Sequence, residues 1–310
     1  MSVRHPRPPA EVAYLTLSGS EEAPLLSAAR DASQYQLCHQ LLAQEVAVAF
    51  CYNGISHAVM MASPDGLEDF AYGFSFCAGV IEHCDQILDL ELTRDAYPGP
   101  DLTHYPEGRE DAVQLNITLS QRAASALRAL RRSLAGGSGC GVCGSEALAQ
   151  VLAPPAGQTD GRFAPLPPTA FLCNVRQRFR QVQQSRRASG AMHSAIYVDA
   201  DGTTRLCRED IGRHNALDKL IGACLREGLD VSAGFVALTS RCSHELIQKA
   251  LRARIGTLVS LASPSDMAVR WARRHGLNLV HLPVQGPARL YSGAGLEYPR
   301  GAPVEQGAKT

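Results

Sequence analysis

The first half of the chain alternates between strand-like and helix-like patterns of apolar residues. Between the first two strand segments lies Asn53-Gly54, the strongest short signal for a β-hairpin turn. Apolar positions recur every three or four residues in the helical segments, and the second of these follows Ser120 as a candidate cap. The predicted strands are 45–52, 55–61, 87–92 and 113–119, and the predicted helices are 67–74 and 120–134. This order indicates a small α+β domain over residues 31–135.

The second half changes to a regular alternation of helices and strands. The predicted helices are 170–184, 213–227, 243–254 and 264–275, and the predicted strands are 195–198, 235–239, 257–261 and 277–282. Such alternation is typical of a three-layer α/β sheet, and residues 169–295 are predicted to form that domain. Ligands of α/β sheets favour the loops beyond the carboxyl ends of the strands. Sites are therefore expected after Val198, after Thr239 and in segment 208–214.

Three segments show no sustained periodicity of apolar residues. Residues 1–30, rich in Pro, Ala and Ser, are expected to form a poorly ordered tail, so that structure begins near Tyr35. Residues 136–168 combine a glycine-rich loop with a proline-rich linker, and residues 296–310 form a second tail. The fold class is thus α/β, with two domains joined by an unusual loop.

Composition and charge exclude several function classes. Apolar residues make up 45% of the chain, and 30 basic residues balance 30 acidic ones. This balance gives no electrostatic reason to expect non-specific binding to nucleic acid or to an anionic membrane. The start has no apolar signal-peptide core, and no run of about eighteen apolar residues occurs. A cytoplasmic protein is expected, with neither nucleic acid nor membrane as a partner.

Ten cysteines in that compartment are expected to be mostly reduced. Eight of them stand singly and are interpreted as small core residues. The remaining two, Cys140 and Cys143, form a C-x-x-C pair whose sulfurs can share a metal, form a disulfide or exchange sulfur. A structural zinc site needs two further ligands, which no second C-x-x-C or H-x3-H supplies. A thioredoxin-like motif would open a helix after an early strand, whereas this pair follows a helix and a glycine tract.

The reading favoured over these is a mobile nucleophilic loop. Five glycines between 136 and 144 permit unusual backbone angles and leave both sulfurs approachable. A short helix start at 145–148 would place Cys143 next to a positive helix end, which lowers the pKa of a thiol. Purely structural packing of both cysteines remains a weaker alternative, because few apolar residues surround them.

Other polar clusters are candidates for binding an anion. In segment 209–219, Arg213 and the main-chain N–H groups at a helix start suit a phosphate, and His214 suits proton transfer. In segment 239–245, Ser240 and Arg241 form a small cationic group at the end of a strand. His193 lies in a flexible polar loop before the first strand of the second domain. The alternative for each cluster is a capping or salt-bridge role, or a hydrogen-bonded core position for His193.

Taken together, these segments resemble the FdhD/NarQ family of formate dehydrogenase accessory sulfurtransferases. The resemblance runs from about residue 45 to 293 and is carried by segments 53–54, 60–64, 67–74, 140–144, 209–219 and 239–246, by His193 and by the segment at Pro264. It implies a C-terminal domain with a cytidine-deaminase-like fold, usually in a homodimer. It also implies transfer of sulfur from a cysteine desulfurase to molybdenum bis(molybdopterin guanine dinucleotide), the cofactor of formate dehydrogenase. The family pattern makes Cys140 the persulfide carrier and Cys143 its neighbour, whereas the helix-end consideration favours Cys143 as the more acidic thiol.

The resemblance also places a cofactor-binding segment near the C-terminus. Its residues here are Leu282, Pro283, Val284, Gln285, Gly286 and Pro287. Family members commonly carry an aromatic residue and an arginine where Leu282 and Val284 stand, so this chain departs from the pattern at those positions. No deaminase activity and no metal of its own are expected, because the only C-x-x-C precedes the α/β domain and lacks the H-x-E or C-x-E partner of zinc deaminases.

Overall fold

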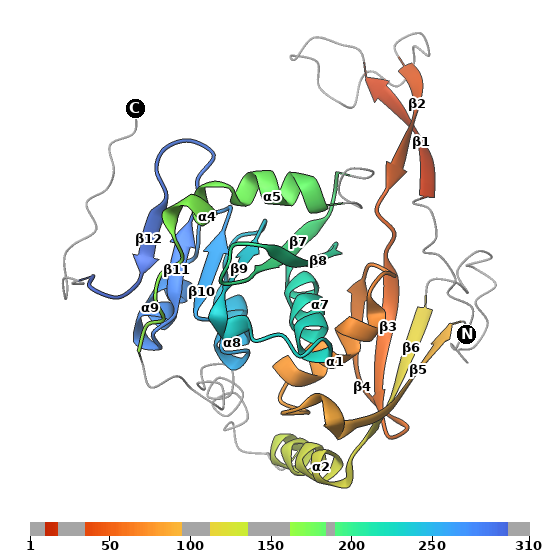
Figure 1. The fold of residues 1–310 in the computed structure, drawn as a ribbon. Helices are drawn as coiled ribbons and strands as arrows, with labels where there is room; N and C mark the ends of the chain where they lie inside the picture. The colour runs from red at the N-terminus through yellow and green to blue at the C-terminus, as the bar shows by residue number, and fades with distance from the viewer. Residues whose placement is uncertain (1–9, 18–34, 95–111, 136–161, 184–189, 297–310) are drawn as a thin grey trace, which may run out of the picture.

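The computed structural model describes residues 10–17, 35–94, 112–135, 162–183 and 190–296. Three sheets lie within these ranges (Figure 1). Strands β1 (Ala10–Leu17) and β2 (Tyr35–Leu42) form an antiparallel pair. The prediction that residues 1–30 form only a tail is wrong at β1, because that strand takes its order from pairing with a segment eighteen or more residues away.

The N-terminal domain is built on a four-stranded sheet in the order β4-β3-β6-β5. Its strands are β3 (Val46–Tyr52), β4 (Ile55–Ala62), β5 (Ile87–Arg94) and β6 (Ala112–Leu119). The hairpin prediction is confirmed: β3 and β4 pair antiparallel, and Asn53 and Gly54 both have positive φ, as a type I′ turn requires. Helices α1 (Leu67–Cys77) and α2 (Gln121–Ala135) supply buried residues to the same core as the strands.

The C-terminal domain is a six-stranded sheet in the order β12-β11-β10-β9-β7-β8. Its strands are β7 (His193–Val198), β8 (Thr204–Asp210), β9 (Phe235–Leu238), β10 (Thr257–Ser260), β11 (Asn278–His281) and β12 (Arg289–Ser292). The central strands β9, β10 and β11 are parallel, whereas β7, β8 and β12 are antiparallel to their neighbours.

Helices cover both faces of this sheet (Figure 1). On one face lie α7 (Arg213–Arg226), α8 (His244–Arg252) and α9 (Asp266–Arg274), which share a core with the strands. On the other face lie α4 (Thr169–Cys173) and α5 (Val175–Val182), whose Leu172, Val175 and Phe179 pack on residues of the opposite side of the strands. The predicted three-layer α/β architecture is confirmed.

Two strands of this domain were missed from the sequence, and one of them changes where a ligand would bind. Strand β8 occupies half of the stretch 199–212 between the predicted strand and helix, and it returns antiparallel from β7. Because β7 is also antiparallel to β9, the loop after Val198 lies at the opposite edge of the sheet from Thr239. The predicted site after Val198 is therefore wrong, and the start of β7 takes its place.

The predicted helix 170–184 is two helices in the structure, separated at Asn174.

The two domains are joined by a close crossing of α1 and α7. A Cβ added at Gly73 would lie 1.7 Å from the carbonyl oxygen of Asp218, and one added at Gly222 would lie 1.9 Å from that of Asp69. No side chain larger than hydrogen fits at either position. Asp69 reinforces the contact, since its carboxylate pairs with Arg208 at 2.7 Å and with Arg226 at 2.5 Å.

Gly73→Ala is expected to destabilise the protein by about 2 kcal/mol or more, because the added methyl group meets main-chain atoms that cannot move aside. The free energy of unfolding is measured by denaturant titration. Gln177→Ala, at an exposed position of α5, is the control and is expected to change it by less than about 0.5 kcal/mol. An unchanged stability of Gly73→Ala would contradict the close crossing of α1 and α7.

Candidate functional site

The carboxyl ends of the central strands gather most of the predicted binding residues at one edge of the C-terminal sheet. The register pairs His193 with Asp210 across β7 and β8, and Ala195 with Leu238 across β7 and β9. It continues from Leu238 through Ser260 to His281. The start of β7 and the ends of β8, β9, β10 and β11 therefore lie side by side. Residues 210–214, 239–243, 261–265 and 282–288 all leave the sheet at this edge, which is called the site edge below.

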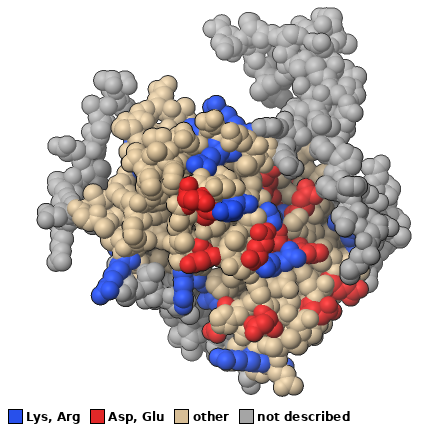
Figure 2. Space-filling model, in the orientation of Figure 1, with Lys and Arg blue, Asp and Glu red and all other residues tan. Residues whose placement is uncertain are grey.

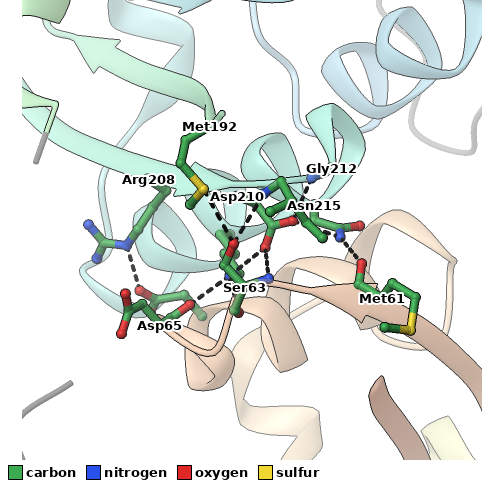
Figure 3. A network of polar contacts seen from close by, with 11 residues as sticks. Met61, Ser63, Asp65, Met192, Arg208, Asp210, Gly212 and Asn215 are labelled. Carbon is green, nitrogen blue, oxygen red and sulfur yellow. Dashed lines mark hydrogen bonds and ion pairs between the residues drawn. The ribbon is translucent and has the colours of Figure 1, made fainter. Parts of the chain in front are cut away.

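A buried polar network fixes the part of the site edge at the end of β8 (Figure 3). The Asp210 carboxylate accepts hydrogen bonds from the main-chain N–H groups of Ser63 at 2.9 Å and Gly212 at 2.7 Å, and from the Asn215 amide at 3.0 Å. It also pairs with the ammonium of Lys219 at 2.6 Å. Both charged side chains are fully buried. Each of these groups donates a hydrogen bond to the carboxylate, as a buried negative charge requires.

The same network reaches the N-terminal domain. Lys219 also donates to the carbonyl oxygens of Ser63 at 2.9 Å and Asp65 at 2.6 Å. In return, the Ser63 hydroxyl accepts from the main-chain N–H of Ile211 at 3.1 Å, and Asn215 donates to the Met61 carbonyl at 2.8 Å. The connection between β4 and α1 is therefore hydrogen-bonded to the connection between β8 and α7, which carries Arg213 and His214.

His214 links the start of α7 to the start of α8. Its Nε2 lies 3.3 Å from the Ser243 hydroxyl and 3.2 Å from a Glu245 carboxylate oxygen. Burial lowers the pKa of His214, with Arg213 acting in the same direction and Glu245 against it. The neutral imidazole that results can accept or donate a proton at this point. The Ser243 hydroxyl faces this ring and makes no side-chain capping bond to α8, so the capping alternative for segment 239–245 is not seen at this residue.

The site edge carries arginines without acidic partners. No ion pair joins Arg176, Arg213, Arg241 or Arg289 to a carboxylate of the described ranges. Elsewhere in these ranges Arg205, Arg208, Arg226 and Arg270 are paired, whereas Arg178 and Arg252 bond only to hydroxyl or carbonyl oxygens. The Nε atom of Arg213 is buried and has no hydrogen-bond partner there. On the face shown in Figure 2, by contrast, basic and acidic side chains are interspersed. A concentration of unpaired guanidinium groups at strand ends suits an anionic ligand.

The predicted cofactor-binding segment begins in the core and emerges at the site edge. Leu282 is buried against the α4–α5 face, so its side chain is turned away from solvent. Val284 is 84% exposed, and Gln285, Gly286 and Pro287 are exposed beside it. Ser240 is buried, and its hydroxyl donates to the Arg241 carbonyl at 3.1 Å, while the Arg241 side chain is exposed. Contacts with a ligand are thus expected from the main chain after Leu282 and from Arg241.

The C-x-x-C pair and the single cysteines are treated separately by the structure. Cys140 and Cys143 lie outside the described residues. Burial raises the pKa of Cys207, Cys224 and Cys242 to about 12, so these remain thiols and are poor nucleophiles. The core interpretation is confirmed for Cys51, Cys224 and Cys242, but it is wrong for Cys173, which is exposed at the end of the short helix α4.

Sequence reasoning missed Arg176, His281 and Arg289 at this edge. Arg176 donates to the carbonyl oxygen of Leu282 at 2.6 Å and weakly to that of Leu261 at 3.4 Å. His281 ends β11 opposite Arg289 of β12. The sequence held one signal for Arg176, the arginine-rich segment 175–182. A helical pattern by itself does not show that this helix lies near the strand ends. No group of three or more metal-ligating side chains occurs in the described part of the chain.

None of the helices described is both long and apolar enough to cross a membrane.

Lys219→Met is expected to lower the free energy of unfolding by about 3–5 kcal/mol, because it leaves the Asp210 carboxylate buried without its counter-charge. Denaturant titration measures the change. The control, Arg205→Met, breaks an exposed pair with Asp199 and is expected to cost less than about 1 kcal/mol. Equal effects of the two substitutions would show that the Lys219–Asp210 pair is not buried in solution.

The free energy of unfolding is also expected to fall as the pH is lowered from 7 to 5.5. Burial lowers the pKa of His214, His244, His275 and His281 below the value of 6.5 that an unfolded chain has. The unfolded state therefore binds more protons in this window, and protonation favours unfolding. Unfolding free energies at the two pH values test this, and His214→Gln should show a smaller drop. A drop of the same size in that variant would exclude His214 as a contributor.

Comparison with known proteins identifies the family. The model of the FdhD/NarQ family matches residues 43–296. The sulfur carrier protein FdhD of Bordetella petrii is 39% identical over 251 residues, which cover 81% of this chain and 84% of that protein. The protein of the same name from Cupriavidus necator is 38% identical over 263 residues, 82% of this chain and 85% of that protein.

A solved structure shares the fold. The crystal structure of a formate dehydrogenase accessory protein from Desulfotalea psychrophila superposes with a TM-score of 0.64 at 18% identity, covering 93% of this chain and 99% of that one. The match of the family model over most of the chain and the two relatives show that the chain belongs to the FdhD/NarQ family.

Proposed function

We propose that this protein is a sulfur carrier that moves persulfide sulfur from a cysteine desulfurase to molybdenum bis(molybdopterin guanine dinucleotide) on behalf of a formate dehydrogenase. The names of its relatives support sulfur transfer. The observation that carries the cofactor half of the proposal is the site edge. Arg213, Arg241 and the segment after Leu282 all lie along this edge, and no ion pair joins either arginine to an acidic side chain of the described residues.

The first chemical step loads sulfur on Cys140. The Cys140 thiolate attacks the outer sulfur of the donor's cysteine persulfide, a new S–S bond forms on Cys140, and the donor leaves as its thiolate. No net oxidation occurs, because one persulfide is exchanged for another. The buried cysteines with raised pKa values do not compete for this sulfur, since they remain protonated.

The second step releases the sulfur. The Cys143 thiolate attacks the inner sulfur of the Cys140 persulfide, forming a Cys140–Cys143 disulfide and expelling hydrosulfide, which carries the two electrons given up by the thiols. A thiol reductant then restores the pair for the next cycle. The cofactor, as the substrate of this step, supplies the metal that takes up the sulfide.

The described residues fit the anionic parts of that substrate. Arg213 and Arg241 suit its phosphates. A nearby imidazole, His193 or His214, suits hydrogen bonding to a base or proton transfer. Residues 284–287 are exposed and can meet the ligand. The cytidine-deaminase-like fold and a homodimer remain predictions from the family resemblance, and a cytoplasmic location remains a prediction from the sequence.

Cys140→Ala is expected to abolish persulfide formation and to reduce activation of formate dehydrogenase to background. The protein is incubated with a cysteine desulfurase and cysteine, and intact mass with peptide mapping detects an added sulfur of roughly 32 Da. Cys173→Ala is the matched control, because Cys173 is an exposed thiol on the same protein. That variant should load sulfur and activate the dehydrogenase as the unaltered protein does.

Full activation by Cys140→Ala would contradict the persulfide role. If that variant also bound the cofactor normally, the protein would instead be a chaperone that carries the cofactor without transferring sulfur. Stoichiometric zinc in the purified protein, lost in both Cys140→Ala and Cys143→Ala, would favour a structural zinc site in place of the nucleophilic loop.

A further inference from the structure

Helix α5 crosses the site edge. It belongs to the layer of helices that covers the face of the sheet opposite α7, α8 and α9. At its start, Arg176 donates to the main chain that follows β10 and β11. Just past its end, the Gln183 amide donates to the Ser194 hydroxyl of β7 at 2.7 Å. The helix therefore lies across the ends of β11, β10, β9 and β7, as Figure 1 shows. One side of α5 thus forms a wall of the site edge.

Arg176 presents an unused cationic group on this wall. A guanidinium has five N–H donors, and the two contacts of Arg176 come from a single terminal nitrogen. Both acceptors are neutral carbonyl oxygens, and no carboxylate of the described ranges pairs with it. Its positive charge is therefore held in place by the strand ends without being neutralised by them.

The neighbours of Arg176 extend this basic group. Arg289 is exposed and stands opposite His281 in the register of β11 and β12. His281 is 4% exposed, and its Nδ1 has no hydrogen-bond partner in the described ranges. Burial lowers the pKa of His281, and the charges of Arg289 and Arg176 act in the same direction. The neutral ring leaves the two guanidinium groups as the charged members of the cluster.

We propose that Arg176 and Arg289 bind a phosphate group at the start of the 282–287 segment. The proposal rests on the proposed function, since the phosphate would belong to the guanine dinucleotide of the substrate. Arg176 is suited to this because its side chain is already ordered by the carbonyl oxygens of Leu282 and Leu261, so little further entropy is lost on binding. The planar fork of arginine also matches the geometry of two phosphate oxygens.

The segment that follows β11 supplies no cation at its start. Leu282 is buried and Val284 is exposed but apolar, so neither supplies a cation to the segment. Arg176 brings one to the same point from a different helix, bonded directly to the Leu282 carbonyl. The charge that the segment itself lacks is thereby provided from α5.

The test measures binding of GDP and of inorganic pyrophosphate to the full chain by calorimetry. Arg176→Gln is expected to weaken both by about tenfold or more, the effect of losing a hydrogen bond to a charged group. Arg178→Gln removes the same charge from the same helix, but Arg178 points to Thr204 at the opposite edge of the sheet. This control is expected to bind both ligands within about twofold of the unaltered protein.

A second variant separates anion binding from a purely structural role. Arg176→Lys keeps the charge and a donor for the Leu282 carbonyl, and it should recover a large part of the affinity lost in Arg176→Gln. If Arg176→Lys binds as poorly as Arg176→Gln and both expose residues 282–296 to limited proteolysis, Arg176 only positions the segment and the proposal is overturned.

The outcomes also distinguish this proposal from the proposed function. If the unaltered protein binds neither GDP nor pyrophosphate, the cofactor half of the proposed function fails together with this one. If it binds both, and Arg176→Gln binds them as tightly as Arg178→Gln does, only the role of Arg176 is refuted. Persulfide loading of Arg176→Gln, measured by intact mass, is expected to be unchanged, because Cys140 receives its sulfur without the substrate.

Discussion

The ion pair between Lys219 and Asp210 is the interaction on which the rest of the structure depends. Removing two charges from water costs several kcal/mol per ion, so such a pair persists only when nearly every remaining donor and acceptor is satisfied. Here the partners come from both domains: main-chain groups of Ser63 and Asp65 on one side, and Gly212 and Asn215 on the other. The pair can therefore be satisfied only when the domains are docked.

Docking of the domains in turn positions the ligand-binding groups. The glycine crossing lets the main chains of α1 and α7 approach closely, and Asp69 holds the same contact through two arginines. Because α7 begins directly after Asp210, the network also fixes Arg213 and His214 at the site edge. The connection that carries Cys140 and Cys143 runs from α2 of one domain to α4 of the other. The network thus ties the Arg213 end of the proposed anion site to the junction between the domains.

The antiparallel strand β7 shows how topology decides the location of a site. The general rule that ligands bind beyond the carboxyl ends of parallel strands holds for β9, β10 and β11. Applied to β7 as well, the rule gives the wrong edge, because β7 runs antiparallel to β9. The same reversal brings His193, at the start of β7, and Asp210, at the end of β8, to the site edge.

The sequence by itself determined the hairpin at Asn53-Gly54, most of the helices and strands of both domains and the short segments that carry the family resemblance, because these depend on local periodicity and turn chemistry. It also identified Arg213 and His214 at a helix start, and Arg241 at the end of a strand, as candidate anion-binding residues. Only the tertiary structure decided that Lys219 and Asp210 are buried together, that Gly73 meets Gly222 and that Arg176 reaches the end of β11. These contacts join residues far apart in the chain, and the free energy of such a contact depends on burial and on partners that no local pattern encodes.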